Sequence, residues 1–167
     1  MNKRGFDNAR VWRLVADVDT DALAPGAYMK HGLEVIGWHC LEAVRSEFAS
    51  GVKEGDVIVA GANFGIGSSR EQAAGVLRHL GLAAVIAPSY SGLFFRNAFN
   101  LGLLLLTCPE ADKIEEGERV ALQFDGDTPQ VMRANGQVLA CAPIPDFLMD
   151  MVDAGGLLPL LKNRKQG

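Results

Sequence analysis

The sequence predicts an α/β fold, with a βαβα core and additional, partly antiparallel strands. In the middle of the chain, short apolar runs alternate with helical patterns, which is typical of parallel strands joined by helices. From residue 119 onward, strand-like segments follow one another around glycine-containing turns, which is typical of antiparallel hairpins. The chain has 167 residues, of which 49% are hydrophobic and 22% charged, so we expect residues 1–167 to form one domain.

In the first third of the chain, two apolar runs predict strands at residues 11–16 and 57–60. An acidic segment, residues 17–21, directly follows the first strand. Residues 22–38 show no clear period and several glycines, which predicts a long loop with short helical pieces. Residues 40–48 carry apolar side chains at helical spacing and predict a helix.

The rest of the chain supplies the remaining predicted elements. A helix is expected to begin near Ser68 or Ser69 and to stop at Gly81. A last helix around Phe147 is expected to end at Gly155-Gly156, with a solvated tail after it. The other expected elements are a helix at 89–101 and strands at 83–87, 103–106, 119–124, 130–134 and 137–140.

Charge and hydropathy argue against two classes of partner. Sixteen Lys and Arg residues against twenty Asp and Glu residues give a net charge of −4, and no long basic cluster indicates a nucleic-acid surface. The longest apolar stretches, such as residues 101–106, are far shorter than the roughly 20 residues of a membrane helix. We therefore expect a cytoplasmic protein that binds neither nucleic acid nor membrane.

The three cysteines, Cys40, Cys108 and Cys141, are too scattered for a disulfide framework and form no C-x-x-C pair. We expect them to be reduced, structural thiols, because a free cysteine usually behaves as a small buried hydrophobic residue. The histidines His31, His39 and His79 have no metal-ligand partner at helical spacing, and none is assigned a catalytic role.

The segment 61–72 carries the strongest functional signal. Gly61, Gly65 and Gly67 follow a strand and precede a helix, so the backbone can approach a ligand closely and the helix start favours an anion. Arg70 lies in the first helical turn, where a cation opposes the helix dipole. Its position makes sense if the guanidinium binds a carboxylate or a phosphate.

Three anion sites and one structural alternative fit this pattern to different degrees. A mononucleotide P-loop needs a Lys followed by Ser or Thr, which is absent. A dinucleotide site needs G-x-G-x-x-G and an acidic residue after the second strand, whereas that strand ends in Ala87-Pro88-Ser89. A small carboxylate held by Arg70, with Ser68 or Ser69 at the reacting carbon, remains. So does helix capping, since Glu71 and Gln72 complete a capping box with either serine.

Several motifs together resemble the aconitase swivel-domain family, in the stand-alone form of the small subunits of 3-isopropylmalate dehydratases. The resemblance covers most of the chain, and its G-x-G-S-S-R-E element is far more specific than a lone glycine loop. The segments that carry it are residues 63–71, 85–90, 95–99, Asp19-Thr20-Asp21 with Pro25, and Gly155-Gly156-Leu157.

The resemblance implies a swivelling β/β/α domain and a hydro-lyase that removes and restores water on a hydroxy-di- or tricarboxylate. It implies a [4Fe–4S] cluster on a separate large subunit, with which this chain would form a heterodimer or heterotetramer, and no metal on this chain. By motif position, Ser68 would be the base that removes a proton beside a carboxylate. By the same carry-over, Ser69 and Arg70 would bind the substrate, and Asp21 would line the site. Beside the resemblance, the amides of Gly65 and Gly67 would favour an oxyanion, and the charge of Lys30 would favour a carboxylate.

The resemblance leaves the substrate open. Gln72 stands where the family commonly has His, and Ile66 where Cys or Ser is usual. In relatives, the loop after the D-T-D segment helps to choose the substrate side chain. Lys30 in this loop could attract an extra carboxylate, whereas an apolar loop would favour an isopropyl group. The hypotheses are a 3-isopropylmalate dehydratase of leucine biosynthesis, a homoaconitase or dimethylmaleate hydratase, and a non-catalytic carboxylate-binding module.

Overall fold

The computed structural model describes residues 5–166, so residues 1–4 and 167 of the predicted domain lie outside the described residues. A seven-stranded sheet has the order β4-β3-β2-β1-β5-β6-β7. Strands β1 to β4 pair in parallel, whereas β5 to β7 are antiparallel. The predicted fold class is therefore confirmed. The strands are β1 (Phe6–Arg13), β2 (Val57–Val59), β3 (Ala84–Ala87), β4 (Leu105–Thr107), β5 (Arg119–Asp125), β6 (Thr128–Arg133) and β7 (Val138–Ala140).

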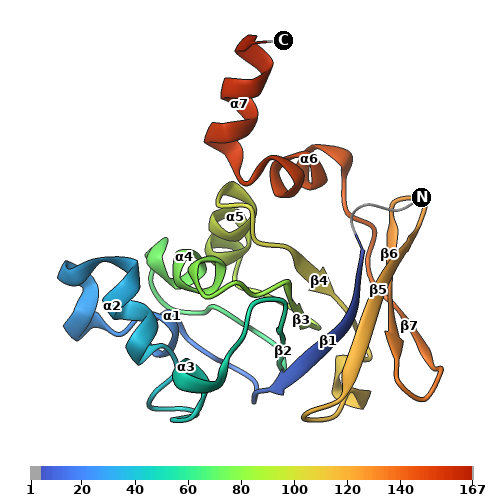
Figure 1. The fold of residues 1–167 in the computed structure, drawn as a ribbon, viewed down its shortest axis with the longest axis horizontal. Coiled ribbons are helices and arrows are strands. Elements are labelled where there is room, and N and C mark those ends of the chain that lie inside the picture. Colours follow the sequence, from blue (N-terminus) through green and yellow to red (C-terminus); the bar gives the residue numbers. More distant parts are fainter. Residues whose placement is uncertain (1–4, 167) are drawn as a thin grey trace.

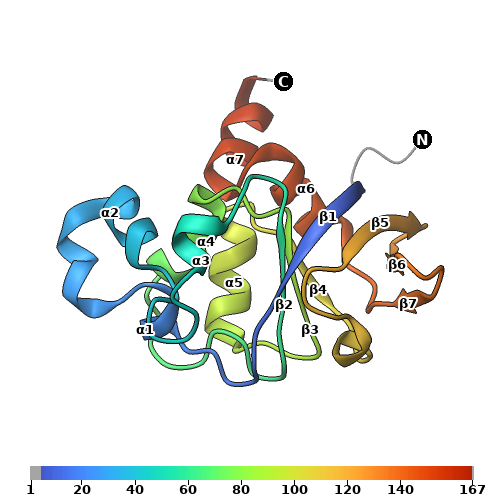
Figure 2. The same ribbon diagram turned by 60° about the horizontal axis from the view of Figure 1, so that its bottom comes forward.

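Helices α1 to α5 gather on one side of the parallel strands (Figures 1 and 2). Strands β5 to β7 extend the sheet beyond β1. The succession β2-α4-β3-α5-β4 is the predicted βαβα core. The helices are α1 (Thr20–Leu23), α2 (Gly32–His39), α3 (Phe48–Gly51), α4 (Gln72–His79), α5 (Gly92–Asn100), α6 (Asp146–Ala154) and α7 (Leu157–Gln166), with 3₁₀ turns η1 (Gly26–His31) and η2 (Ala111–Lys113).

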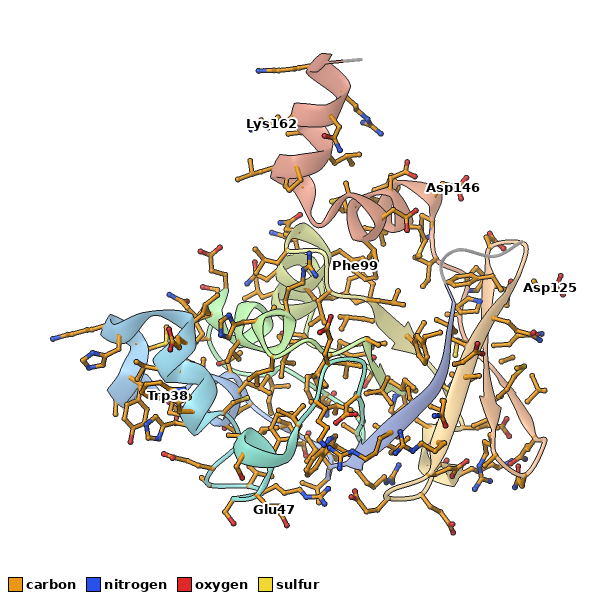
Figure 3. The ribbon with its side chains drawn as sticks, in the orientation of Figure 1. Trp38, Glu47, Phe99, Asp125, Asp146 and Lys162 are labelled. Atoms are coloured by element: carbon orange, nitrogen blue, oxygen red, sulfur yellow. The ribbon has the colours of Figure 1, made fainter. Side chains whose placement is uncertain are left out.

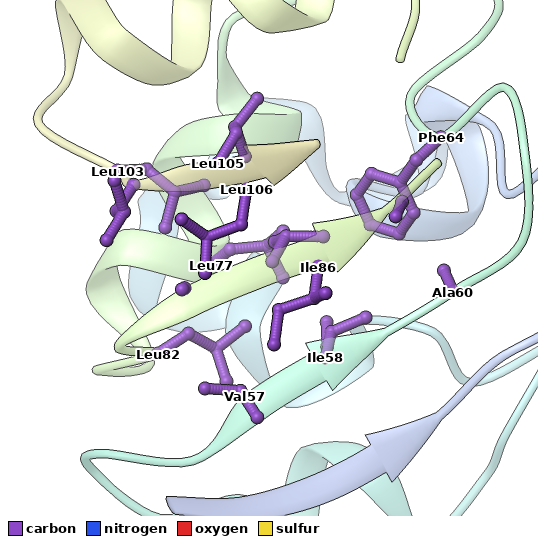
Figure 4. Packing of buried hydrophobic residues seen from close by; sticks show 14 of the residues in the cluster. Val57, Ile58, Ala60, Phe64, Leu77, Leu82, Ile86, Leu103, Leu105 and Leu106 are labelled. Atoms are coloured by element: carbon purple, nitrogen blue, oxygen red, sulfur yellow. The ribbon is translucent and has the colours of Figure 1, made fainter. Parts of the chain in front are cut away.

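The core lies between the parallel strands and the helices that connect them. Ile58 of β2, Ile86 of β3 and Leu77 of α4 are fully buried, and Phe64 closes the end of this cluster (Figure 4). Burial of each such side chain contributes roughly 1.5–3 kcal/mol. The strand ends that lead into the acidic segment and the glycine loop are thus firmly placed.

A buried carboxylate fixes β1 against the turn before β2. Asp56 Oδ2 accepts hydrogen bonds from Trp12 Nε1 at 2.8 Å, Arg10 Nη2 at 2.8 Å and the Lys53 amide at 2.9 Å. Burial raises the pKa of the Asp56 carboxyl, but these hydrogen bonds and the Arg10 charge outweigh burial and lower it overall. Arg10 and Arg45 also lie over the Trp12 ring, at 4.7 and 4.6 Å from its centre.

The first strand begins earlier than the predicted 11–16 and ends at Arg13. Its first half pairs with β5 across an irregularity between Phe6 and Ala9, where Asn8 has a φ of 53°. This half carries exposed Asp7 and Asn8, so no apolar run marks it.

The predicted helix at 40–48 is wrong. Helix α2 ends at His39, and Leu41 adopts a φ of 62°, which interrupts a right-handed helix. The Leu41 amide donates to the Ala22 carbonyl at 2.8 Å, which ties this segment to α1. Leu41 and Phe48 are fully buried. Their apolar character therefore reflects burial within turns and not one face of a helix. The short helical pieces expected in 22–38 are confirmed by η1 and α2.

The predicted helix around Phe147 is confirmed, because α6 ends at Ala154 and is followed by the C-cap residue Gly155, which has a left-handed φ of 90°. The tail is solvated as predicted, but residues 157–166 form the helix α7, from which Lys162 extends outward (Figure 3). No helix in the described part of the chain is long and apolar enough to span a membrane.

Candidate functional site

The site lies where the segments that follow β1 and β2 run side by side. The carboxyl ends of parallel strands share one edge of a sheet, so both segments leave the sheet at the same place. The Thr20 amide donates to the Ile66 carbonyl at 2.8 Å, and the Gly65 amide donates to the Val18 carbonyl at 2.7 Å. The acidic segment and the glycine loop are therefore joined through their backbones.

Two positions of the loop require glycine, because the backbone has a positive φ there and a Cβ atom would clash with a neighbouring side chain. Gly65 has a φ of 83°, and a Cβ there would overlap the ring of Phe94 on α5. Gly67 has a φ of 111°, and a Cβ there would come within 3.0 Å of Thr20 Oγ1. The Gly65 N–H is used by Val18, so it cannot donate to an anion. Gly65 thus allows the loop to pack closely, and its amide does not bind a ligand.

Ser68 presents an exposed hydroxyl between two other polar groups. Its Oγ accepts a hydrogen bond from Arg70 Nε at 3.0 Å and lies 3.2 Å from Thr20 Oγ1. The Ser68 amide donates to Thr20 Oγ1 at 3.1 Å. A hydroxyl held next to a guanidinium can lose its proton more readily than one in water.

Arg70 links the glycine loop to the segment after β1. Its Nη1 donates to Asp21 Oδ1 at 3.2 Å and to the Ala24 carbonyl at 2.8 Å. Its Nε donates to Ser68, so the contacts among the described residues use Nε and Nη1. The two N–H groups of Nη2 are left for a ligand. Arg70 can therefore meet a carboxylate with one nitrogen, and not with the two-nitrogen fork that its position in the sequence suggested.

The capping interpretation of the paired serines is wrong. Helix α4 begins at Gln72, its N-cap is Glu71, and no side chain caps it. The Ser68 hydroxyl instead meets Thr20 and Arg70. Ser69 is exposed, and its carbonyl accepts a hydrogen bond from Asn97 Nδ2 of α5 at 2.9 Å.

Most of the predicted site residues come together, and one does not. Asp21 and Arg70 form an ion pair at 3.2 Å, and Ser68 touches Arg70. Lys30 lies exposed on η1, and no hydrogen bond or ion pair among residues 5–166 joins it to this group. Gly65, Gly67 and Ser69 lie in the same loop as Ser68.

Sequence reasoning missed two residues that contact the site segment. Thr20 lay inside the quoted D-T-D segment but received no role, because a threonine between two acidic residues is not by itself a chemical signal. Asn97 lies in the helix expected at 89–101 and received no role, yet its Nδ2 donates to the Ser69 carbonyl. Only the packing of α5 beside the glycine loop reveals this contact.

A buried phenol steadies the neighbouring strand end. Tyr90 follows β3, and its hydroxyl lies within hydrogen-bond distance of the Val85 and Leu106 carbonyls, at 2.9 and 2.7 Å, so that its single proton is shared between them or given to one. Burial raises the pKa of Tyr90 well above its ordinary value, so it stays a neutral donor. Its backbone pairs with Phe64 at the start of the glycine loop.

The described residues contain no group of three or more His, Cys, Asp or Glu side chains that could hold a metal ion. The three cysteines are free and buried, as expected of structural thiols. Burial raises the pKa of the Cys40 thiol, which disfavours a thiolate there. The residues described here therefore do not fit an iron–sulfur cluster held by this chain alone.

Comparisons with known proteins place this fold in a family. The family model of the aconitase C-terminal domain matches residues 42–111. The chain is 41% identical over 158 residues to the 3-isopropylmalate dehydratase small subunit 1 of Archaeoglobus fulgidus, covering 94% of this chain and 98% of that protein. It is 40% identical over 156 residues to the methanogen homoaconitase small subunit of Methanothermobacter thermautotrophicus, covering 92% and 89%.

A solved structure supports the same assignment. The crystal structure of a 3-isopropylmalate dehydratase from Methanocaldococcus jannaschii superposes with a TM-score of 0.89 and 37% identity, covering 97% of this chain and 96% of that chain. The fold and these matches thus define an aconitase C-terminal, or swivel, domain. Within this class, the chain belongs to the family of small subunits of isopropylmalate dehydratase and homoaconitase-type hydro-lyases.

Proposed function

We propose that this chain is the small subunit of a cytoplasmic 3-isopropylmalate dehydratase, with residues 1–167 acting as one swivel domain beside a large subunit. The complex would interconvert 2-isopropylmalate and 3-isopropylmalate by loss and readdition of water, a step of leucine biosynthesis. The observation that carries the proposal is the exposed Ser68 hydroxyl, which accepts a hydrogen bond from Arg70 Nε at 3.0 Å.

In this proposal, Ser68 Oγ takes the proton from the carbon beside a substrate carboxylate. A serine hydroxyl is a very weak base and needs stabilisation as an anion. The Arg70 N–H and positive charge supply it, and their effect grows once a partner excludes water from the exposed loop. The [4Fe–4S] cluster expected on the large subunit would act as a Lewis acid toward the substrate hydroxyl.

Substrate binding would use the rest of the loop and its neighbour. The Nη2 of Arg70 meets a carboxylate, while Asp21 holds the guanidinium in place through Nη1. The exposed Ser69 hydroxyl is available to the same ligand. Gly67 keeps the loop close to Thr20, and Lys30 on η1 would approach only a larger substrate.

The test is Ser68→Ala in the complex with its large subunit and cluster. Loss of the base should lower kcat by roughly 10²–10⁴-fold while the complex still assembles. Ser50→Ala is the matched control, because Ser50 lies on α3 and its hydroxyl bonds only the Glu47 carbonyl among the described contacts. A Ser68→Ala complex with the parental rate would contradict the proposal and favour a non-catalytic carboxylate-binding module.

A homoaconitase-type activity is the second candidate, because the homoaconitase small subunit matches this chain about as well as the dehydratase subunits do. Lys30 is exposed in the loop after the D-T-D segment and could attract an additional carboxylate. Competition between 2-isopropylmalate and a homologous tricarboxylate, with dimethylmaleate as a third substrate, in one assay decides between the activities. Faster use of the tricarboxylate would replace the first proposal.

A further inference from the structure

Thr20 is one of two polar residues that are buried in the described part of the chain; the other is Asp56. Its side chain is only 3% exposed, although it belongs to a segment whose Asp19 and Asp21 are exposed. A buried hydroxyl needs hydrogen-bond partners, because a polar group that leaves water without one is destabilising. The partners of Thr20 therefore show what it does.

Both side-chain hydrogen bonds of Thr20 go to Ser68. The Ser68 amide donates to Thr20 Oγ1 at 3.1 Å, and the two hydroxyl oxygens lie 3.2 Å apart. The Thr20 amide is meanwhile fixed to the Ile66 carbonyl at 2.8 Å, so the residue cannot shift away. Gly67 leaves the space for this contact.

The proton between the two hydroxyls can lie on either side, and its position depends on the charge of Ser68. When Ser68 is neutral, either hydroxyl can donate to the other. When Ser68 is an anion, only Thr20 can donate. Ser68 Oγ then accepts from Thr20 Oγ1 and from Arg70 Nε, which gives it two fixed donors from two different segments.

We propose that Thr20 is a positioning residue that sets the Ser68 side chain and donates a hydrogen bond to its anion during proton removal. The inference rests on the proposed function of Ser68 as the base. It adds a second donor that stabilises the charged state more than the neutral one, and this difference is what accelerates a reaction.

Other charged groups around Ser68 stay the same when Thr20 is replaced. They are Arg70 and Glu71 on its own loop and Asp19 and Asp21 on the segment packed against it, while Asn97 of α5 is neutral. A change in the pH dependence of the rate on replacing Thr20 alone would therefore report the lost donor.

Thr20→Val and Thr20→Ser in the complex with the large subunit test the proposal. Valine keeps the shape but removes the donor, so kcat should fall roughly 10²-fold, as for loss of one oxyanion donor, with KM changed far less. The acidic, ascending limb of the pH–rate profile should move to higher pH, because the Ser68 anion is less stable and forms only at higher pH. Serine keeps the hydroxyl and should restore both the rate and the profile.

Each result has a defined meaning. A Thr20→Val complex with the parental rate and profile overturns the inference, as does a loss of rate with an unmoved profile in both variants, which would show a purely structural role. Thermal unfolding of the free chain reports how far the variants disturb the fold. Ser68→Ala in the same assay distinguishes a failure of this inference from a failure of the proposed function. If Ser68→Ala is inactive and Thr20→Val is normal, only this inference fails, whereas an active Ser68→Ala removes the proposed function itself.

Discussion

Asn63 and Asp17 follow two neighbouring parallel strands, and Asn63 Nδ2 donates to Asp17 Oδ1 at 2.9 Å. Both residues have a left-handed φ, 62° and 60°, which Asn and Asp tolerate better than most other residues. Each turn leads the chain from its strand into one of the two segments of the site. The pair thus sets the point from which Thr20 and Ser68 approach each other.

Arg70→Lys should lower kcat/KM of the complex roughly 10²-fold or more. Lysine keeps the charge, but a single ammonium cannot serve Ser68 Oγ, Asp21 and the Ala24 carbonyl in the planar geometry of the guanidinium. Steady-state kinetics measure the effect. Arg164→Lys on the exposed helix α7 is the control, and similar rates in both variants would show that the guanidinium geometry of Arg70 has no specific role.

Gly65→Ala should destabilise the chain by about 3 kcal/mol. The added methyl group would overlap the Phe94 ring and would also sit at a φ of 83°. Gly55→Ala is the matched control, because Gly55 has a φ of 91° but no atom within 4 Å of the added Cβ. It should cost only about 1–2 kcal/mol in urea unfolding. Equal losses would mean that the contact with Phe94 contributes nothing.

Asp56→Asn should lower the free energy of unfolding by about 3 kcal/mol, because it leaves the Arg10 charge without its partner. The Asp56 side chain is 7% exposed and accepts hydrogen bonds from three residues, so solvent cannot replace the lost charge. Denaturant unfolding checks this. Asp125→Asn at an exposed hairpin position should change stability by less than about 0.5 kcal/mol, and a similarly small change for Asp56→Asn would refute the argument.

Stability should fall in acid below about pH 4.5. Burial raises the pKa of the Asp56 and Glu118 carboxyls, but hydrogen bonds and charge from Arg10 and Arg133 more than reverse this, so both values are lowered on folding. Groups with lowered pKa stabilise the folded state above their unfolded pKa. They lose that contribution as the pH falls through the folded pKa.

Urea unfolding between pH 6 and pH 2.5 measures this acid dependence. Glu118→Gln should reduce stability at neutral pH and flatten the decline in acid, because one of the carboxyls with a lowered pKa no longer titrates. An acid decline as steep as that of the parent chain would show that Glu118 is not among the groups responsible.

The sequence predicted those parts of the fold in which local pattern and burial agree. The runs at 57–60 and 83–87 are buried on both faces, and their apolar character alone identified β2 and β3. The helix predicted at 40–48 was wrong because the Leu41 amide bonds to the Ala22 carbonyl. This contact joins two segments, so the local spacing of apolar residues cannot predict it. Tertiary contacts decided that segment.

For the site, the sequence supplied the residues but not all of their contacts. The glycine loop, Ser68 and Arg70 were found from spacing, and Asp21 from the resemblance. The Nη1 bonds of Arg70 and the hydroxyl of Thr20 could not be predicted, because they depend on how two segments about 50 residues apart meet. Lys30 was named from charge alone, and the structure gives it no contact among the described residues with the rest of the group.

Strand β1 occupies the middle of the sheet, with parallel β2 on one edge and antiparallel β5 on the other. A strand paired on both edges opens last, so the amides of its second half should be among the slowest to exchange with deuterium. The segment with Thr20 begins only a few residues beyond this strand. The polar groups of the site thus follow directly from a strand held on both edges, and docking of a second polypeptide would meet a surface already in place.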